Sequence, residues 1–246
     1  MGFASLIYGL FCYLVFLGSF FYLMAFVGDF GVPRSVSVGP AGPWWQALAV
    51  DFALVAVFGC QHSLMARPGF KRAWLRLVPP HLERSTYVLL SSAALALLFW
   101  LWRPLPAEVW HLRQPVLRLA VQAGFGAGAA LVVTSTFLIS HGDLFGLRQV
   151  WARFRGVPHQ EAAFRLTAFY ARVRHPLMLG FLATFWATPR MTVGHLVFAW
   201  AMTVYILVGT ALEEKDLLRS LGSRYAAYRR EVPRFFPVPW RRAGKE

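Results

Sequence analysis

Residues 3–27, FASLIYGLFCYLVFLGSFFYLMAFV, decide the fold class of this chain. The stretch holds no charged side chain, and it exceeds the roughly 20 apolar residues with which a helix crosses about 30 Å of hydrocarbon. It is also longer than the ~7–15 apolar residues of a secretory signal core, and no small-residue cleavage site follows it. We therefore expect it to remain in the protein as a membrane-spanning helix.

Further apolar segments follow at 45–62, 87–102 and 116–140, of which 87–102 is short and needs a turn from its flanks. Near the C-terminus, segments 177–188 and 193–212 are separated by the helix breaker Thr188-Pro189-Arg190. They are typical of a helical hairpin whose first arm, about 18 Å long, is too short to span and must be sheltered by protein. The sequence thus predicts an all-α, polytopic membrane bundle of four spanning helices plus a C-terminal hairpin.

The composition agrees with a membrane protein, with 57% hydrophobic residues, 15% charged residues and a mean hydropathy of +0.49. The formal net charge is +14, and 20 of the 25 Lys and Arg residues fall in 67–84, in 141–175 and after 212. The positive-inside rule therefore places both termini and the two basic loops in the cytoplasm. Topology and lipid headgroups account for this charge, so we expect membrane lipids rather than nucleic acid as partners, and no obligate protein partner.

Other features exclude further classes of site. Cys12 and Cys60 lie in apolar runs without metal-ligand spacing, so neither a disulfide framework nor a metal site is expected. The polar loop after residue 141 contains a predicted helix at 161–172. Tryptophans near helix ends are typical of an interfacial belt; here they are Trp44, Trp45, Trp100 and Trp102.

Polar residues collect at one level of the predicted bundle, where ionisable groups are costly and indicate function. This level holds Tyr8, His62, Tyr87, His141, Asp143, Arg174, His175, Glu213 and Glu214. The structural alternative is that these residues cap helices, snorkel or meet headgroups, and Glu213-Glu214 before Lys215 also suits a solvated helix exit. Asp51 lies inside the second segment near the opposite face, so we expect it to be structural and paired with a neighbouring polar group.

The C-terminal third carries a recognisable series of motifs. They are YARVRHPLMLG at 170–180, EEKDLL at 213–218, GSRYAAY at 222–228 and VPRFFP at 232–237. Together they resemble the isoprenylcysteine carboxyl methyltransferase and phospholipid methyltransferase superfamily, with its Arg-His-Pro-x-Tyr-x-Gly, Glu-Glu, Tyr-x-x-Tyr and Pro-Arg-Phe-x-Pro pattern. Met178 departs from this pattern where many members have Tyr, which bears on the substrate subclass more than on the cofactor.

The resemblance implies a site for S-adenosylmethionine at the cytoplasmic boundary. Arg174 and His175 offer donors to its carboxylate beside the positive end of the helix that Pro176 begins. Glu213 or Glu214 would meet its ammonium, sulfonium or ribose groups, Gly180 would permit close approach, and aromatic residues would stack on adenine. The residues assigned to this site are Tyr170, Arg174, His175, Leu179, Gly180, Glu213, Glu214, Tyr225 and Arg234.

The N-terminal two-thirds narrow the resemblance. Three segments are similar to those of bacterial methanethiol S-methyltransferases: QHSLMARPGFK at 61–71, ERSTYV at 83–88 and HGDLFGLRQ at 141–149. Nurim-like membrane proteins share related N-terminal motifs. The resemblance implies that residues 1–140 carry the side chains that face the substrate, a small volatile thiol. It implies that residues 141–246 form the methyl-donor site. It also implies a multi-pass protein of the bacterial inner membrane.

The chemistry of thiol methylation suits the remaining residues. Sulfur attacks as thiolate, and a simple thiol has a pKa no lower than ~8.5, so a base would help at neutral pH. His62 and His141 are the candidates for this base; Asp143 would orient one of them, and Tyr87 or Tyr8 would hydrogen-bond the sulfur. A dry site favours the reaction because thiolate and sulfonium neutralise each other.

Three alternatives stay open at this point. The same donor would serve a prenylcysteine carboxylate or a lipid amine as acceptor. A nurim-like structural membrane protein would need no donor. A transporter predicts charged residues at mid-membrane and paired broken helices, whereas here the polar groups crowd one face.

Overall fold

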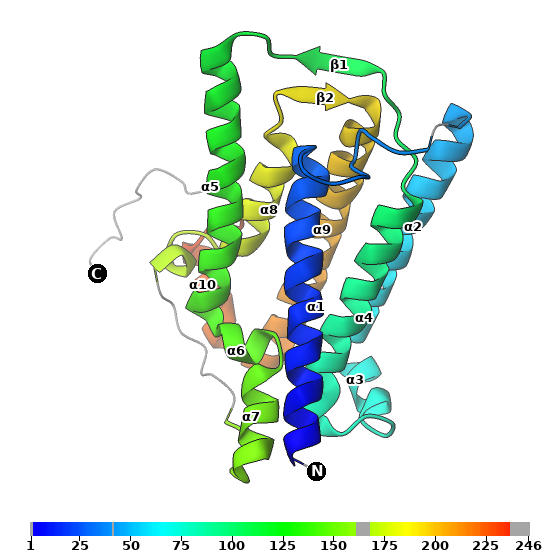
Figure 1. Cartoon of the computed structure of the whole chain (residues 1–246). Coiled ribbons are helices and arrows are strands. Elements are labelled where there is room, and N and C mark those ends of the chain that lie inside the picture. The colour runs from blue at the N-terminus through cyan, green and yellow to red at the C-terminus, as the bar shows by residue number, and fades with distance from the viewer. Residues whose placement is uncertain (1, 41, 161–167, 237–246) are drawn as a thin grey trace, which may run out of the picture.

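The computed structural model, which describes residues 2–40, 42–160 and 168–236, is a bundle of long helices (Figure 1). Within these residues, five helices are long and apolar enough to cross a membrane: α1 (Gly2–Gly28), α2 (Trp44–Met65), α4 (Pro80–Leu101), α5 (Pro115–Ile139) and α9 (Val193–Leu221). The apolar helix α8 (Pro176–Trp186) is shorter. The predicted polytopic all-α bundle is therefore confirmed, and α8 is the half-length arm of the hairpin.

Helix starts follow the prolines of the sequence. Pro68, Pro80, Pro115 and Pro176 stand in the first turn of α3 (Pro68–Trp74), α4, α5 and α8, where the missing N–H costs no hydrogen bond. The predicted third helix therefore begins at Pro80 and not at residue 87, so Tyr87 lies within it. Of the predicted helix at 161–172, residues 161–167 lie outside the described residues, and a 3₁₀ turn, η1, covers Ala168–Ala171.

The end of the bundle opposite α3 carries a small sheet that the sequence did not lead us to expect. Strand β1 (Glu108–His111) pairs antiparallel with β2 (Arg190–Thr192), which begins at the last residue of the breaker Thr188-Pro189-Arg190. The backbone N–H of Leu112 also donates to the carbonyl of Pro189 at 2.8 Å. These bonds satisfy polar backbone groups in the two connections, and Figure 1 shows the sheet closing that end.

The short arm α8 lies against α5, where two glycines bring the backbones together. A Cβ on Gly180 would lie 2.7 Å from the carbonyl oxygen of Gly128, and a Cβ on Gly128 would lie 2.8 Å from that of Gly180. Small residues permit such contacts between helices in membranes. Gly180, expected from the sequence to permit close approach of a cofactor, permits the close approach of α5 in the structure.

The half of the bundle nearer the sheet holds two buried polar groups with a structural role, the indole of Trp102 and the carboxyl group of Asp51. Trp102 is buried and donates its indole N–H to the carbonyl of Val36 at 3.1 Å, so its predicted place in an interfacial belt is wrong. Trp44, Trp45 and Trp100 are exposed. Asp51 is fully buried, and its Oδ1 accepts the backbone N–H of Arg103 at 2.9 Å, which confirms the predicted pairing with a neighbouring polar group.

Candidate active site

The Arg-His-Pro segment at the start of α8 is joined to the C-terminal tail by backbone hydrogen bonds. The N–H of Arg174 donates to the carbonyl of Pro233 at 2.9 Å, and the N–H of His175 donates to that of Arg234 at 3.1 Å. The two motifs that resembled a methyl-donor signature are therefore neighbours in space, although the residues of each bonded pair are 59 positions apart in the sequence.

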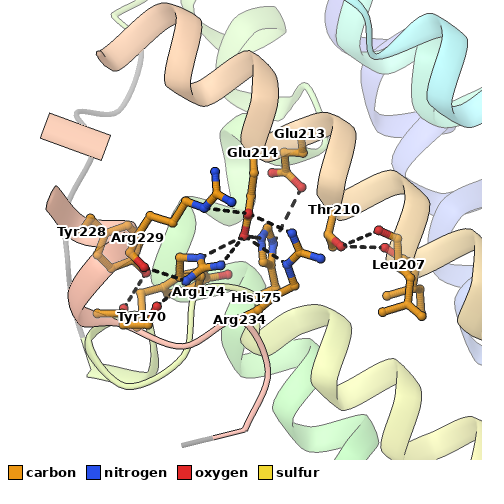
Figure 2. A network of polar contacts seen from close by, with 12 residues as sticks. Tyr170, Arg174, His175, Leu207, Thr210, Glu213, Glu214, Tyr228, Arg229 and Arg234 are labelled. Atoms are coloured by element: carbon orange, nitrogen blue, oxygen red, sulfur yellow. Dashed lines mark hydrogen bonds and ion pairs between the residues drawn. The ribbon is translucent and has the colours of Figure 1, made fainter. Parts of the chain in front are cut away.

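Glu214 on α9 is the centre of an ionic cluster (Figure 2). Its side chain is only 2% exposed. Oε1 accepts the Nε–H of Arg174 at 2.9 Å and lies 3.1 Å from Nε2 of His175, while Oε2 accepts from Nη2 of Arg234 at 3.0 Å. This buried carboxylate is therefore neutralised by groups of the chain itself.

Arg174 is likewise committed to the chain. Its side chain is 8% exposed, Nη2 lies 2.8 Å from Glu214, and Nη1 donates to the carbonyls of Arg229 (3.1 Å) and Val232. Arg174, predicted to bind a cofactor carboxylate, ties α8, α9 and α10 (Ser223–Glu231) together through these contacts. Arg234, whose side chain is 31% exposed, remains more accessible.

Glu213 differs from Glu214 in its accessibility. Its side chain is 51% exposed, and its Oε2 lies 3.8 Å from Nδ1 of His175. Its charge also lies within electrostatic range of the phenols of Tyr87 and Tyr205, on α4 and α9. Of the two predicted carboxylates, Glu213 is thus the accessible one, and its charge acts on Tyr87 and Tyr205 as well as on the ionic cluster.

The aromatic residues of the tail divide into packed and accessible groups. Tyr225 is buried against Tyr228, with ring centroids 5.8 Å apart, and burial raises the pKa of both to about 12. Tyr228 donates to the carbonyl of Tyr170 at 2.6 Å. Tyr170 is partly exposed, and burial, with the charge of Glu213 second, raises its pKa. Tyr225 therefore packs within the tail, whereas Tyr170 remains able to face a ligand.

A second polar cluster surrounds His62 near the end of α2. Its Nε2 lies 2.7 Å from the hydroxyl of Tyr87, and its Nδ1 lies 3.1 Å from Oγ of Ser91. The ring of Tyr205 from α9 is 6.3 Å from the imidazole, and the guanidinium of Arg84 lies 4.9 Å above the ring of Tyr87. The predicted partnership of His62 and Tyr87 is thus present, at hydrogen-bonding distance.

A third cluster of the same kind surrounds His141 at the start of α6 (His141–Leu144). Its Nε2 lies 2.8 Å from the hydroxyl of Tyr13 on α1, and its Nδ1 lies 2.8 Å from Oγ1 of Thr136. Phe137 stacks on the imidazole at 4.3 Å, and burial lowers the pKa of His141. The histidine is therefore held neutral among aromatic rings at ordinary pH.

Asp143 and Tyr8 lie beside these clusters but make other contacts. Asp143 accepts the hydroxyl of Ser140 at 2.6 Å and faces Arg148 (3.4 Å) and His159 (3.5 Å). These partners differ from His62 and His141, one of which Asp143 was predicted to orient. The hydroxyl of Tyr8 lies 3.0 Å from that of Thr86, at the expected level but with a different partner.

One apolar cluster joins the two histidine sites. Its buried members are Met65, Tyr87, Val88 and Phe145, and Tyr13 and Phe16 pack against them. The loop after α6 contacts α4 at Gly146. This position requires glycine for two reasons: its φ is +83°, and a Cβ there would lie only 2.5 Å from Oγ of Ser85. The helix ends thus bring Tyr13 and Tyr87 to one dry region. The described residues contain no group of three or more His, Cys, Asp or Glu able to hold a metal ion.

Comparison with known proteins decides the family. The chain is 55% identical to the methanethiol S-methyltransferase of Mycobacterium tuberculosis over 237 residues, which cover 96% of this chain and 97% of that protein. It is 47% identical to methanethiol S-methyltransferase 2 of Bradyrhizobium diazoefficiens, over 95% of this chain and 90% of that one. The chain belongs to the methanethiol S-methyltransferase family.

Membership of the methanethiol S-methyltransferase family makes this protein a methyltransferase. Nurim of Danio rerio is also similar, at 29% identity over 75% of this chain and 70% of nurim. No protein-family profile matches the chain, and no solved structure matches it. The higher identity and coverage of the methyltransferases favour the enzyme over the nurim-like structural alternative.

Four residues of this methyltransferase's clusters were missed from the sequence: Tyr13, Ser91, Thr136 and Tyr205. Each is a hydroxyl-bearing side chain inside an apolar helix, and such residues usually bond to their own helix backbone or pack. The available signal was spacing, because Ser91 follows Tyr87 by four residues and so lies on the same face of α4. Only the packing of α2 against α4 shows that this face meets His62.

Proposed function

We propose that this protein methylates methanethiol to dimethyl sulfide, using S-adenosylmethionine, by in-line displacement at the membrane boundary. Two relatives named methanethiol S-methyltransferase match this chain over at least 90% of their own length. The observation that carries the proposal is the exposed carboxylate of Glu213 beside the ionic cluster: its Oε2 lies 3.8 Å from Nδ1 of His175, and its charge acts on the phenol of Tyr87, which is the partner of His62. Glu213 thus links the proposed donor site to the proposed base site.

The residues around Glu213 suit such a donor in their chemistry. An accessible carboxylate attracts ammonium and sulfonium charge or ribose hydroxyls, Arg234 is a partly exposed cation for a carboxylate, and Tyr170 is a partly exposed ring for a base. When bound, S-adenosylmethionine supplies an electrophilic methyl group on a positively charged sulfur. Glu214 and Arg174 hold this region in shape without contacting the ligand.

The remaining residues act on the thiol. Tyr87, Met65, Val88 and Phe145 exclude water from the region where sulfur would lie, which favours the meeting of thiolate and sulfonium. His62, or alternatively His141, accepts the proton that the thiol loses, and the tyrosine hydroxyls contact the sulfur. Residues 1–140 accordingly provide the thiol side, and residues 141–246 the donor side.

The topology proposed with this function places the site at the cytoplasmic face of the bacterial inner membrane. The basic loops and tail at that end of the bundle motivate this orientation. Fusions of green fluorescent protein to the C-terminus should fluoresce, and fusions of alkaline phosphatase at the same point should be inactive. Active phosphatase there would reverse the orientation.

The activity is tested with purified protein in detergent. Given S-adenosylmethionine labelled in its methyl group and methanethiol, it should release labelled dimethyl sulfide into the headspace, and prenylcysteine carboxylates and lipid amines should not compete. Calorimetric titration with S-adenosylhomocysteine reports donor binding separately. If the donor binds and no thiol is methylated, the proposed acceptor is wrong; if neither occurs, the nurim-like alternative gains support.

Substitution of each histidine tests whether it acts in turnover or in donor binding. His62→Ala and His141→Ala should lower kcat more than donor affinity, because both rings contact tyrosines at the thiol side and neither contacts the Glu214 cluster in the described structure. A general base contributes on the order of 100-fold to 10,000-fold in rate. Weakened titration by S-adenosylhomocysteine with unchanged kcat would make them donor residues instead.

A further inference from the structure

The imidazole of His62 is held between two hydroxyls from one face of α4. Tyr87 lies 2.7 Å from Nε2, and Ser91, four residues later, lies 3.1 Å from Nδ1. Residues four apart on a helix are neighbours on its surface, so a single helix face clamps both ring nitrogens. Ser91 is buried, with 7% of its surface exposed, and no role has so far been assigned to it.

The hydrogen bonds of Ser91 determine which nitrogen of His62 carries the proton. Oγ of Ser91 donates its one proton to the carbonyl of Tyr87 at 2.9 Å, because a carbonyl can only accept. The same oxygen can therefore only accept from His62, so Nδ1 must be the protonated nitrogen. Nε2 is left with its lone pair, directed at the phenol of Tyr87.

The histidine of the third cluster has the same arrangement. Oγ1 of Thr136 donates to the carbonyl of Val133 at 2.7 Å and lies 2.8 Å from Nδ1 of His141, whose Nε2 faces the hydroxyl of Tyr13 at 2.8 Å. In both cases a back-bonded hydroxyl leaves the basic nitrogen facing a tyrosine. The His62 pair is distinguished by Glu213, whose charge lies within electrostatic range of Tyr87.

We propose that Ser91 is a positioning residue that locks His62 in its Nδ1–H form, so that Tyr87 and His62 together remove the proton of the thiol. The S–H bond breaks as its proton passes to the phenol oxygen of Tyr87, and the sulfur keeps the electron pair. The phenol O–H bond breaks at the same time as its proton passes to Nε2 of His62. The imidazolium later releases this proton to solvent, and the proposal rests on the proposed function.

The chemistry of the relay determines the test. A relay that only removes a proton matters less when the thiol is already acidic, whereas a residue that only supports the fold affects every thiol alike. Ethanethiol and 2,2,2-trifluoroethanethiol form a pair of similar size in which the fluorines make the second thiol more acidic. Ser92→Ala is the control, because Ser92 is a buried serine one position further along α4 and so lies on another face.

Ser91→Ala should lower kcat for ethanethiol by about 10-fold to 100-fold, at the lower end of what a general base contributes. For trifluoroethanethiol the loss should shrink to about threefold or less, and the affinity for S-adenosylhomocysteine should not change. Ser92→Ala should leave the ratio of the two thiols as in the unaltered protein.

Two results would overturn the proposal. An equal loss for both thiols would reduce Ser91 to a packing role, and a thiol-dependent loss in Thr136→Ala but not in Ser91→Ala would move the base to His141. If the unaltered protein binds S-adenosylhomocysteine but methylates neither these thiols nor methanethiol, the proposed function has failed, and this outcome is distinguishable from failure of the relay.

Discussion

The polar groups around Glu214 and those around His62 are built from opposite chemistry. Around Glu214, Arg174 and Arg234 bond one buried carboxylate, and the cluster is strongly charged. Around His62, the hydrogen-bond partners are the neutral hydroxyls of Tyr87 and Ser91. A cluster of buried charges is stable only while every member is paired, whereas a neutral cluster can hold a basic nitrogen ready for a proton.

This contrast assigns the two clusters different tasks. The ionic cluster connects α8, α9, α10 and Arg234 around one buried carboxylate (Figure 2). The hydroxyl cluster adjoins an apolar cluster through Tyr87, which suits the proposed removal of a thiol proton away from water. We therefore expect substitutions in the first cluster to affect stability and those in the second to affect turnover.

The largest expected effect is that of Glu214→Gln. Removing this charge leaves Arg174 and Arg234 without their buried partner, which typically costs about 3–5 kcal/mol. The melting temperature in detergent should fall markedly. Glu213→Gln is the matched control, and because its carboxylate is half exposed its melting temperature should change little. Equal losses for the two variants would contradict the distinction between the carboxylates.

A smaller effect is expected where α8 meets α5, because this contact fixes the helix that begins after His175. In Gly180→Ala the new Cβ would lie 2.7 Å from the carbonyl of Gly128, and such overpacking costs about 1–3 kcal/mol. Gly126→Ala is the control on α5, since its Cβ would meet nothing within 4 Å. That variant should be neutral or slightly more stable. A stable Gly180→Ala protein with weakened donor binding would restore the cofactor role first expected of Gly180.

The third prediction concerns the ligand that Glu213 faces. Glu213→Gln should weaken binding of S-adenosylmethionine by about tenfold, which corresponds to about 1.4 kcal/mol. Comparison with S-adenosylhomocysteine, which lacks the sulfonium charge, identifies the contacted group. A loss confined to S-adenosylmethionine indicates the sulfonium, and an equal loss for both ligands indicates the ammonium or the ribose. Unchanged affinity for both would remove Glu213 from the donor site.

The smallest effect is expected at Asp143, which belongs to neither cluster. Asp143→Asn retains the shape but weakens contacts to Arg148 and His159, and partly exposed ion pairs are worth about 0–1 kcal/mol. Melting temperature and kcat should both stay close to those of the unaltered protein. A kcat reduced more than tenfold would return Asp143 to the catalytic role predicted from the sequence.

Much of the bundle follows from local sequence properties. Residues 3–27 are apolar for long enough to span, and Pro176 with the breaker at Pro189 limits α8 to a half-length arm. The motif residues of the C-terminal third also identified the elements that meet around Glu214. The β1/β2 pair was not predictable, because Glu108–His111 carries no alternating pattern and gains its partner only from a distant loop.

The roles of individual residues within the site were less predictable. Glu213 and Glu214 are adjacent and chemically identical, and their sequence offers no ground for preferring either. Their directions from α9 differ by about 100° of helix rotation, so one meets three arginines and the other remains accessible. In the sequence, Ser91 and Thr136 are ordinary hydroxyl residues of apolar helices. Only the packing of α2 and α6 beside them brings them to His62 and His141.

The sequence by itself determined the membrane-spanning architecture, the family and the set of polar residues at one end of the bundle, because apolar length and motif spacing are local properties of the chain. Only the tertiary structure decided which polar group pairs with which. Hydrogen bonds and ion pairs depend on atoms brought within about 3 Å by helix packing. That packing joins residues as far apart as Tyr13 and His141, which are 128 positions apart in the chain.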